Sequence, residues 1–197
     1  MDSRSSSIER LSRIIDVGDI DLRGRTSPDG AVTIMFSDIE DSTELVERLG
    51  DEDWLGVLRV HNRLIRESVN RHGGSEVKAQ GDGFMLAFTS SRAALSCAVD
   101  IQRTLAMDGA ASEHSIRVRI GLHSGFMIHE EDDYIGRNVI LAARIADQAC
   151  GDEILVSSEL KEFVEASAPA RFLEPRPLEL KGLSGVHWAY PVDWRAG

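Results

Sequence analysis

The chain has 197 residues, 42% of them hydrophobic, and a formal net charge of −11 at pH 7. This size and composition suit one domain with a sizeable core. Binding to a nucleic-acid backbone is disfavoured, because no block of Lys or Arg interrupts the acidic composition. The two cysteines, Cys97 and Cys150, have no nearby CxxC partner and are interpreted as reduced thiols. With neither a secretory signal nor an apolar run of membrane-spanning length, we expect a cytoplasmic protein without a membrane partner.

The N-terminal region, residues 1–29, is polar, and we expect a lead-in that is disordered in part. Within it, Ile8, Leu11, Ile14 and Ile15 have the spacing of one face of a short docked helix. The folded domain is expected over residues 30–193, followed by a short tail at 194–197.

Further along the chain, hydrophobic periodicity predicts alternating strands and helices. Strands are expected at 31–38, 75–80, 83–88 and 116–128, with late strands at ILVS and LELKGL, and helices at 41–49, 52–72, 90–106 and 137–149. The pair SEVKAQ and GFMLAF, joined by Gly81 and Asp82, is typical of a β-hairpin. This order predicts an α/β fold of the α+β sandwich type, with a βαββαβ core and extra elements.

Two acidic residues lie where a strand ends. Asp38 follows the apolar run TIMFS, and Asp82 lies at the hairpin tip between two glycines. Taken singly, each is better interpreted as a cap or turn residue. Together, two carboxylates at the ends of adjacent strands are suited to divalent cations that bridge to substrate phosphates. The segment from Ile39 to Thr43 begins a helix, and its free amides are suited to phosphate oxygens.

Five sequence blocks, read in order, resemble the catalytic domain of class III nucleotidyl cyclases. They are FSDIEDST, KAQGDGF, RIGLHSG, GRNVILAARIADQA and ELKGL, and the resemblance covers about residues 30–192. It implies the ferredoxin-like fold of that family. It also implies an adenylate cyclase, a phosphorus–oxygen lyase that converts ATP to 3′,5′-cyclic AMP and pyrophosphate in signal transduction.

The resemblance assigns metal ligands among these residues. Asp38 and Asp82 match the two metal-binding aspartates, and the carbonyl of Ile39 is the additional ligand. Two divalent ions are implied, Mg²⁺ or Mn²⁺, and the sequence does not choose between them because both accept carboxylate and phosphate oxygens. One lowers the effective pKa of the ribose 3′-hydroxyl and the other holds the phosphates.

Base recognition falls by resemblance to Lys78 and to Asp133 in DDYIG. A lysine only donates hydrogen bonds and adenine N1 accepts, whereas a carboxylate accepts from the 6-amino group. Guanine presents the opposite pattern at this edge, so ATP is favoured over GTP. Without the surrounding motifs, both residues would be interpreted as solvated surface groups.

The same resemblance assigns residues that contact the phosphates. Arg144 in LAARI matches the arginine that stabilises charge developing at the phosphorus. Lys181 in ELKGL matches a lysine that contacts the terminal phosphates, and Thr43 lies in the phosphate-receptive helix start.

One position departs from the family pattern, which has an asparagine directly after the valine of GRNVILAAR. Here Ile140 follows Val139, and isoleucine cannot hydrogen-bond to the ribose. Asn138 is poorly placed to substitute, since a two-residue step rotates a helix by about 200°. Loss of one transition-state donor costs on the order of 10²-fold in rate, so a slow cyclase is expected.

The family builds each site from two subunits, so the resemblance implies a head-to-tail homodimer with ATP bound between the chains. Asp38 and Asp82 of one chain then work with Lys78, Asp133 and Arg144 of the other. The alternative is a degenerate cyclase domain that serves as a nucleotide-binding or dimerisation module, and Ile140 favours it. A diguanylate cyclase or polymerase is a third interpretation, but no GGDEF-type block occurs.

Overall fold

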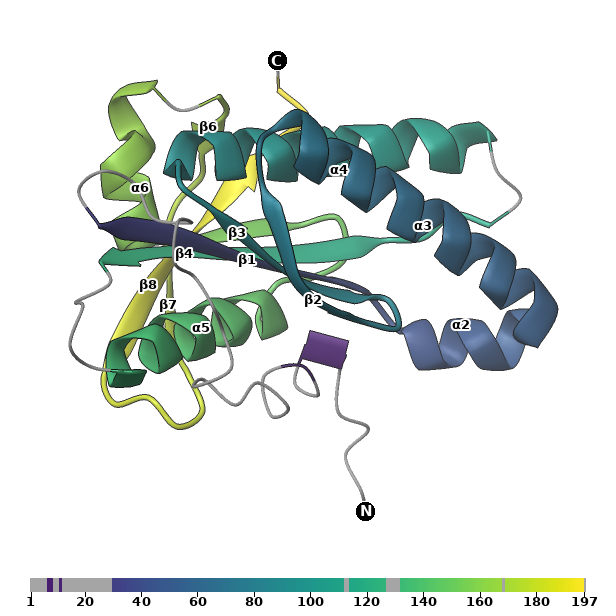
Figure 1. Cartoon of the computed structure of the whole chain (residues 1–197), viewed down its shortest axis with the longest axis horizontal. Helices are drawn as coiled ribbons and strands as arrows, with labels where there is room; N and C mark the ends of the chain where they lie inside the picture. Colours follow the sequence, from purple (N-terminus) through teal and green to yellow (C-terminus); the bar gives the residue numbers. More distant parts are fainter. Residues whose placement is uncertain are drawn as a thin grey trace.

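The computed structural model describes residues 7–8, 11, 30–111, 114–126, 132–167 and 169–196, without the side chains of 110–111, 132–135 and 167. Figure 1 shows one sheet flanked by helices on both faces. The elements in chain order are β1 (Ala31–Ile39), α2 (Ser42–Leu49), α3 (Asp51–Arg71), β2 (Ser75–Gln80), β3 (Gly83–Phe88), α4 (Ser91–Ala111), β4 (Val118–Phe126), α5 (Asp132–Asp147), β5 (Ile154–Ser157), α6 (Ser158–Val164), a 3₁₀ turn (Glu165–Ser167), β6 (Arg171–Phe172), β7 (Arg176–Glu179) and β8 (Val186–Asp193).

The sheet has eight strands in the order β2-β3-β1-β4-β5-β8-β6, with β7 also paired to β8. Strand β1 is antiparallel to both β3 and β4, which places it at the centre of the βαββαβ core. The predicted α+β class and the ferredoxin-like core are therefore confirmed. The second half of the chain extends this core through β5, which is parallel to β4.

Successive side chains along a strand point to opposite faces of the sheet, and in this chain both faces carry apolar side chains. Met35 and Ile39 of β1 pack toward α3 and α4, which together cover one face (Figure 1). Val32, Ile34 and Phe36 point to the opposite face, which α5 covers together with Ile8 and Leu11. We call this second side the α5 face. Asp38 lies two residues after Phe36 in β1, so its side chain projects from the same α5 face.

The N-terminal region contributes to this core. Ile8 and Leu11 are both 0% exposed and are buried together with Phe36 and Met85. Their predicted docking is confirmed, whereas Ile14 and Ile15 lie outside the described residues.

Several elements differ from those predicted. Helix α5 begins at Asp132, five residues before the predicted start at 137. The LELKGL strand ends at Glu179, because Lys181 and Gly182 form a turn in which Gly182 has φ +82°. Strands β6 and β8 and helix α6 were not predicted. The β8 sequence VHWAYPVD lacks a clean alternation of apolar and polar residues, since the exposed positions Val186 and Trp188 are also apolar.

Candidate active site

The two aspartates predicted to bind metal lie on neighbouring antiparallel strands. Asp38 is the second-last residue of β1, and Asp82 is in the turn between β2 and β3. Since Ser37 pairs with Phe84, the end of β1 lies beside the start of β3, and this register brings the two carboxyl groups together. Asp38 is 1% exposed and Asp82 4% exposed. Two buried acids in contact form a site whose charge requires a partner.

A cross-strand arginine supplies part of that charge. Arg119 of β4 pairs with Asp38 of β1, and its Nη2 lies 2.8 Å from Asp38 Oδ2. Burial, followed by the nearby carboxyl group of Asp82, raises the pKa of Asp38 to about 8, against the lowering effect of Arg119. The arginine therefore does not compensate fully for two buried carboxylates.

Two carboxylate oxygens at this site fit a divalent cation. Asp38 Oδ1 and Asp82 Oδ2 are buried and have no hydrogen-bond partner among the described residues. Buried polar atoms are normally paired, and hard cations prefer such oxygens as ligands. The backbone of Ile39, at the end of β1, lies directly beside Asp38. These residues therefore fit the metal ions that the sequence implies.

The next acidic residue has a structural role instead. The Glu40 carboxylate accepts a hydrogen bond from the amide of Gly151 at 2.7 Å and forms an ion pair with Arg117. Its own amide donates to the carbonyl of Arg117 at 2.8 Å. Glu40 thus joins the turn after β1 to the segment before β5, which fixes the backbone that follows Ile39.

The predicted phosphate segment begins helix α2 next to the aspartates. Asp41 precedes the helix in a left-handed conformation (φ +54°), and its side chain makes no capping hydrogen bond. The amides of the first turn are therefore not capped by that side chain. Thr43 lies in this turn and is exposed.

Of the predicted base-reading residues, Lys78 is described in full. It lies in β2 opposite Met85, immediately after a register shift between Glu76 and Lys78, and it is half-buried. Asp133 falls in the first turn of α5, but its side chain lies outside the described residues.

The structure brings Arg144 and Lys181 together. Arg144 Nε donates to the carbonyl of Lys181 at 3.2 Å, and its Nη1 lies 3.2 Å from Asp147 Oδ2. Lys181 itself is exposed in the turn after β7. The guanidinium of Arg144 is thus held beside the turn that carries Lys181, another residue predicted to bind phosphate.

The side chains of Ile140 and Asn138 face different environments. Ile140 is 37% exposed. Asn138 Oδ1 accepts a hydrogen bond from His123 Nε2 at 3.2 Å, and Asn138 Nδ2 donates to the carbonyl of Phe126 at 3.3 Å. The sequence-based expectation that Asn138 does not substitute at position 140 agrees with this placement.

Two contacts to the aspartates were not predicted from the sequence. Arg119 reaches Asp38, and its position opposite Asp38 follows only from strand register. Ser7 donates from Oγ to Asp82 Oδ1 at 2.6 Å, across 75 positions of the chain. No short-range pattern signals either contact.

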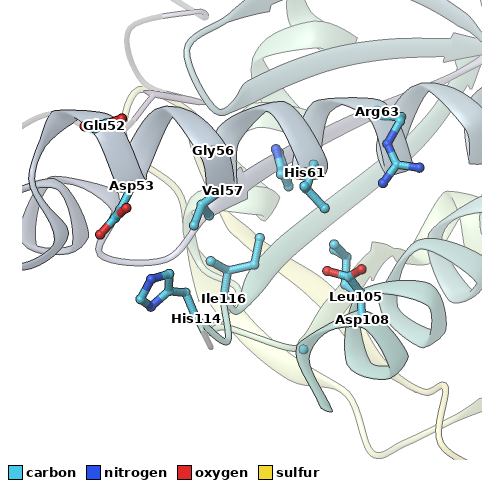
Figure 2. A pocket seen from close by; sticks show the side chains of 12 residues that line it. Glu52, Asp53, Gly56, Val57, His61, Arg63, Leu105, Asp108, His114 and Ile116 are labelled. Atoms are coloured by element: carbon cyan, nitrogen blue, oxygen red, sulfur yellow. The ribbon is translucent and has the colours of Figure 1, made fainter. Parts of the chain in front are cut away.

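A separate hollow of about 450 Å³ lies between α3 and α4, on the face opposite α5 (Figure 2). Glu52, Asp53, Asp108 and His114 are among the residues that line it, and none of the described site residues above does. Buried His61 also lines it, and burial lowers the pKa of that imidazole. The Asp38–Asp82 site is therefore distinct from this hollow.

The comparisons with known proteins agree with this geometry. The model of the adenylate and guanylate cyclase catalytic domain matches residues 25–190, and the chain belongs to that family, the class III nucleotidyl cyclases. An uncharacterized protein of Mycobacterium tuberculosis is 33% identical over 148 residues, which are 74% of this chain and 49% of that protein. An adenylate cyclase of Mycosarcoma maydis is 33% identical over an alignment of 158 positions that covers 68% of this chain and 6% of that enzyme.

Solved structures show the same fold. An adenylate cyclase of Trypanosoma brucei, described in its monomeric state, superposes with a TM-score of 0.68 at 26% identity, covering 87% of this chain and 93% of that one. Of the two sequence relatives named above, this chain spans about half of the mycobacterial protein and a small part of the fungal enzyme. In the described part of the chain, no helix is both long and apolar enough to cross a membrane.

Proposed function

We propose that this domain is an adenylate cyclase that converts ATP to 3′,5′-cyclic AMP and pyrophosphate. One observation carries the proposal: two buried carboxylate oxygens, on Asp38 and Asp82, have no hydrogen-bond partner in the described part of the chain. They lie at adjacent strand ends, beside a helix start that the Asp41 side chain does not cap. Similarity to fungal adenylate cyclases supports ATP as the substrate.

In this proposal Asp38, Asp82 and the Ile39 carbonyl hold two divalent ions, Mg²⁺ or Mn²⁺. When bound, these ions offset phosphate charge and make the ribose 3′-hydroxyl more acidic. Arg119 stays on Asp38 Oδ2 and fixes that carboxylate, so that Oδ1 faces the site.

The remaining residues bind and orient the nucleotide. Lys78 donates to adenine N1 and Asp133 accepts from the 6-amino group. The amides near Thr43, together with Lys181, bind the β- and γ-phosphates. The 3′-oxygen gives its proton to water and attacks the α-phosphorus, the bond from that phosphorus to the bridging oxygen breaks, and pyrophosphate leaves. Arg144 stabilises the charge that develops there.

We further propose that each site is shared across a head-to-tail homodimer. Asp38 and Asp82 then come from one chain, and Lys78, Asp133 and Arg144 from its partner. The grouping of Arg144 with Lys181, on elements other than β1 and the β2–β3 turn, supports a site built from two surfaces.

The direct test is to incubate the purified protein with ATP or GTP and with Mg²⁺ or Mn²⁺, and to measure cyclic product. Cyclic AMP with ATP, abolished by Asp82→Asn, is the expected result. Asp53→Asn, an exposed change on α3, is the control and leaves the activity intact. Cyclic GMP as the main product would contradict the choice of ATP.

One observation favours a second candidate function, a nucleotide-binding or dimerisation module. Ile140 presents an apolar side chain, 37% exposed, where the family has its ribose-binding asparagine. Bound nucleotide without cyclic product under any of these conditions would favour this module.

A further inference from the structure

We propose that the segment carrying Ser7, Ile8 and Leu11 is an autoinhibitory strap that closes the Asp38–Asp82 site to divalent metal and nucleotide. The proposal rests on the function proposed above and adds regulation of the same site. It concerns the described residues of the N-terminal region, which Figure 1 shows in purple beside β2.

The first observation is that the acidic pair is sealed. A carboxylate that binds a metal–triphosphate must be reached by a large, charged ligand. Asp38 and Asp82 are only 1% and 4% exposed, and no described residue forms a hydrogen bond to Asp38 Oδ1 or Asp82 Oδ2. The described structure is therefore a closed form of this site, and admission of substrate requires some covering group to move.

The second observation identifies a covering group. Ser7 Oγ donates to Asp82 Oδ1 at 2.6 Å, and Ser7 is itself 1% exposed. A hydroxyl bound to this oxygen occupies one of the lone pairs that a cation would use. Ser7 and a divalent ion thus compete for the same carboxylate.

The third observation explains how Ser7 is held there. Both crossover helices of the core, α3 and α4, lie on one face of the sheet, which leaves β1 and β3 apolar on the α5 face. Ile8 and Leu11 cover this area and are packed with Phe36 and Met85. Burial of these two side chains anchors Ser7 at the acidic pair.

The fit is close because β3 begins with glycine. A Cβ placed on Gly83 would lie 2.9 Å from both Ser7 Cβ and Leu11 Cδ1. The strap therefore rests directly on the backbone that follows Asp82. Since Asp38 projects from the same face as Phe36, the strap covers the side from which that carboxylate is reached.

The first experiment displaces the strap in the full chain. Ile8→Glu places a charge in an apolar contact and should expel the segment, whereas Met107→Glu introduces the same group at a side chain that is 74% exposed. We expect Ile8→Glu to bind Mn²⁺ about tenfold more tightly, measured by calorimetry, and to form cyclic product about tenfold faster. The Met107→Glu control should match the wild type. Mn²⁺ affinity in a folded Ile8→Glu variant equal to that of the wild type would overturn the strap.

The second experiment does not depend on displacing the strap by mutation. Ser7→Cys in a Cys150→Ser background places a thiol at the contact, and the remaining Cys97 is buried. Alkylation of the introduced thiol should be slow in the metal-free protein and about tenfold faster with Mn²⁺ and 3′-deoxy-ATP, which lacks the attacking hydroxyl. Thr89→Cys, at an exposed position, is the comparison and should react at one rate throughout.

The outcomes separate this inference from the proposed function. Alkylation that stays slow while Mn²⁺ and nucleotide bind would show that the strap does not move, whether or not the protein is a cyclase. Faster alkylation and tighter Mn²⁺ binding without cyclic product from any triphosphate would support the strap and reject the cyclase.

Discussion

His123 Nε2 lies 3.2 Å from Asn138 Oδ1, which ties strand β4 to helix α5 two residues before Ile140. His123 Nδ1 lies 2.9 Å from Ser157 Oγ, so the same ring also contacts the start of α6. The Asn138 side chain is thus hydrogen-bonded to β4. The exposed Ile140 lies at the position where the family pattern has the asparagine that binds the ribose.

Restoring that donor should therefore raise the rate. We expect Ile140→Asn to increase kcat for cyclic AMP by tenfold or more, since one transition-state hydrogen bond is worth on the order of 10²-fold. Ile140→Ala removes the same apolar group without supplying a donor and is the matched control. Turnover in Ile140→Asn that stays at the level of the alanine variant would show that position 140 does not limit the reaction.

Base selection should respond to Lys78. Replacing it with a carboxylate in Lys78→Glu removes the proposed donor to adenine N1 and supplies an acceptor for the N1–H of guanine. The ratio of kcat/KM for ATP to that for GTP should fall at least tenfold. Lys78→Met, which removes the charge without adding an acceptor, should lower ATP use without improving GTP use. A ratio unchanged in both variants would contradict base reading by this residue.

The stability of the metal-free protein should depend on pH through Asp38. Its folded-state pKa of about 8 exceeds the ordinary value of 3.8, so the folded state holds this proton more tightly than the unfolded state. The contribution is fully present below about pH 4 and is lost as the pH rises to 8. Asp38→Asn should abolish activity yet raise the melting temperature at pH 8 more than at pH 5. Mn²⁺ should stabilise the wild type but not this variant at pH 8. An equal effect of the substitution at both pH values would contradict the assignment.

The close contact between α5 and the sheet should be intolerant of a single methyl group. A Cβ on Gly121 of β4 would lie 2.3 Å from the backbone nitrogen of Ala146, and α5 also carries Arg144. Gly121→Ala should cost about 1–3 kcal/mol in urea unfolding and lower activity by displacing this helix. Gly56→Ala, where the added Cβ would meet no described atom within 4 Å beyond the adjacent backbone of its own helix, should instead be neutral or stabilise α3 by up to about 1 kcal/mol. Equal unfolding free energies for the two variants would contradict this packing.

Prediction from sequence succeeded where the signal is local. The apolar run before Asp38 and the glycines around Asp82 identify a strand and a hairpin whose bounds match the structure. Strand β8 was missed because two of its apolar residues, Val186 and Trp188, are exposed and its pairing with β5 links distant parts of the chain. The contacts of Ser7 and Arg119 depend on strand order and register, which one-dimensional periodicity does not contain.

Shared sites can be tested by mixing two inactive chains. Asp38→Ala removes a proposed metal ligand, and Arg144→Ala removes the group proposed to stabilise the developing charge. In a head-to-tail heterodimer, one of the two sites combines both substitutions and the other has neither. Mixing the variants after separate purification should therefore restore activity, to about one quarter of the wild-type level if subunits exchange at random. Two different substitutions on the same side, Asp38→Ala with Asp82→Ala, are the control and should not complement. Absence of rescue in an exchanged Asp38→Ala and Arg144→Ala mixture would show that each chain carries its own complete site.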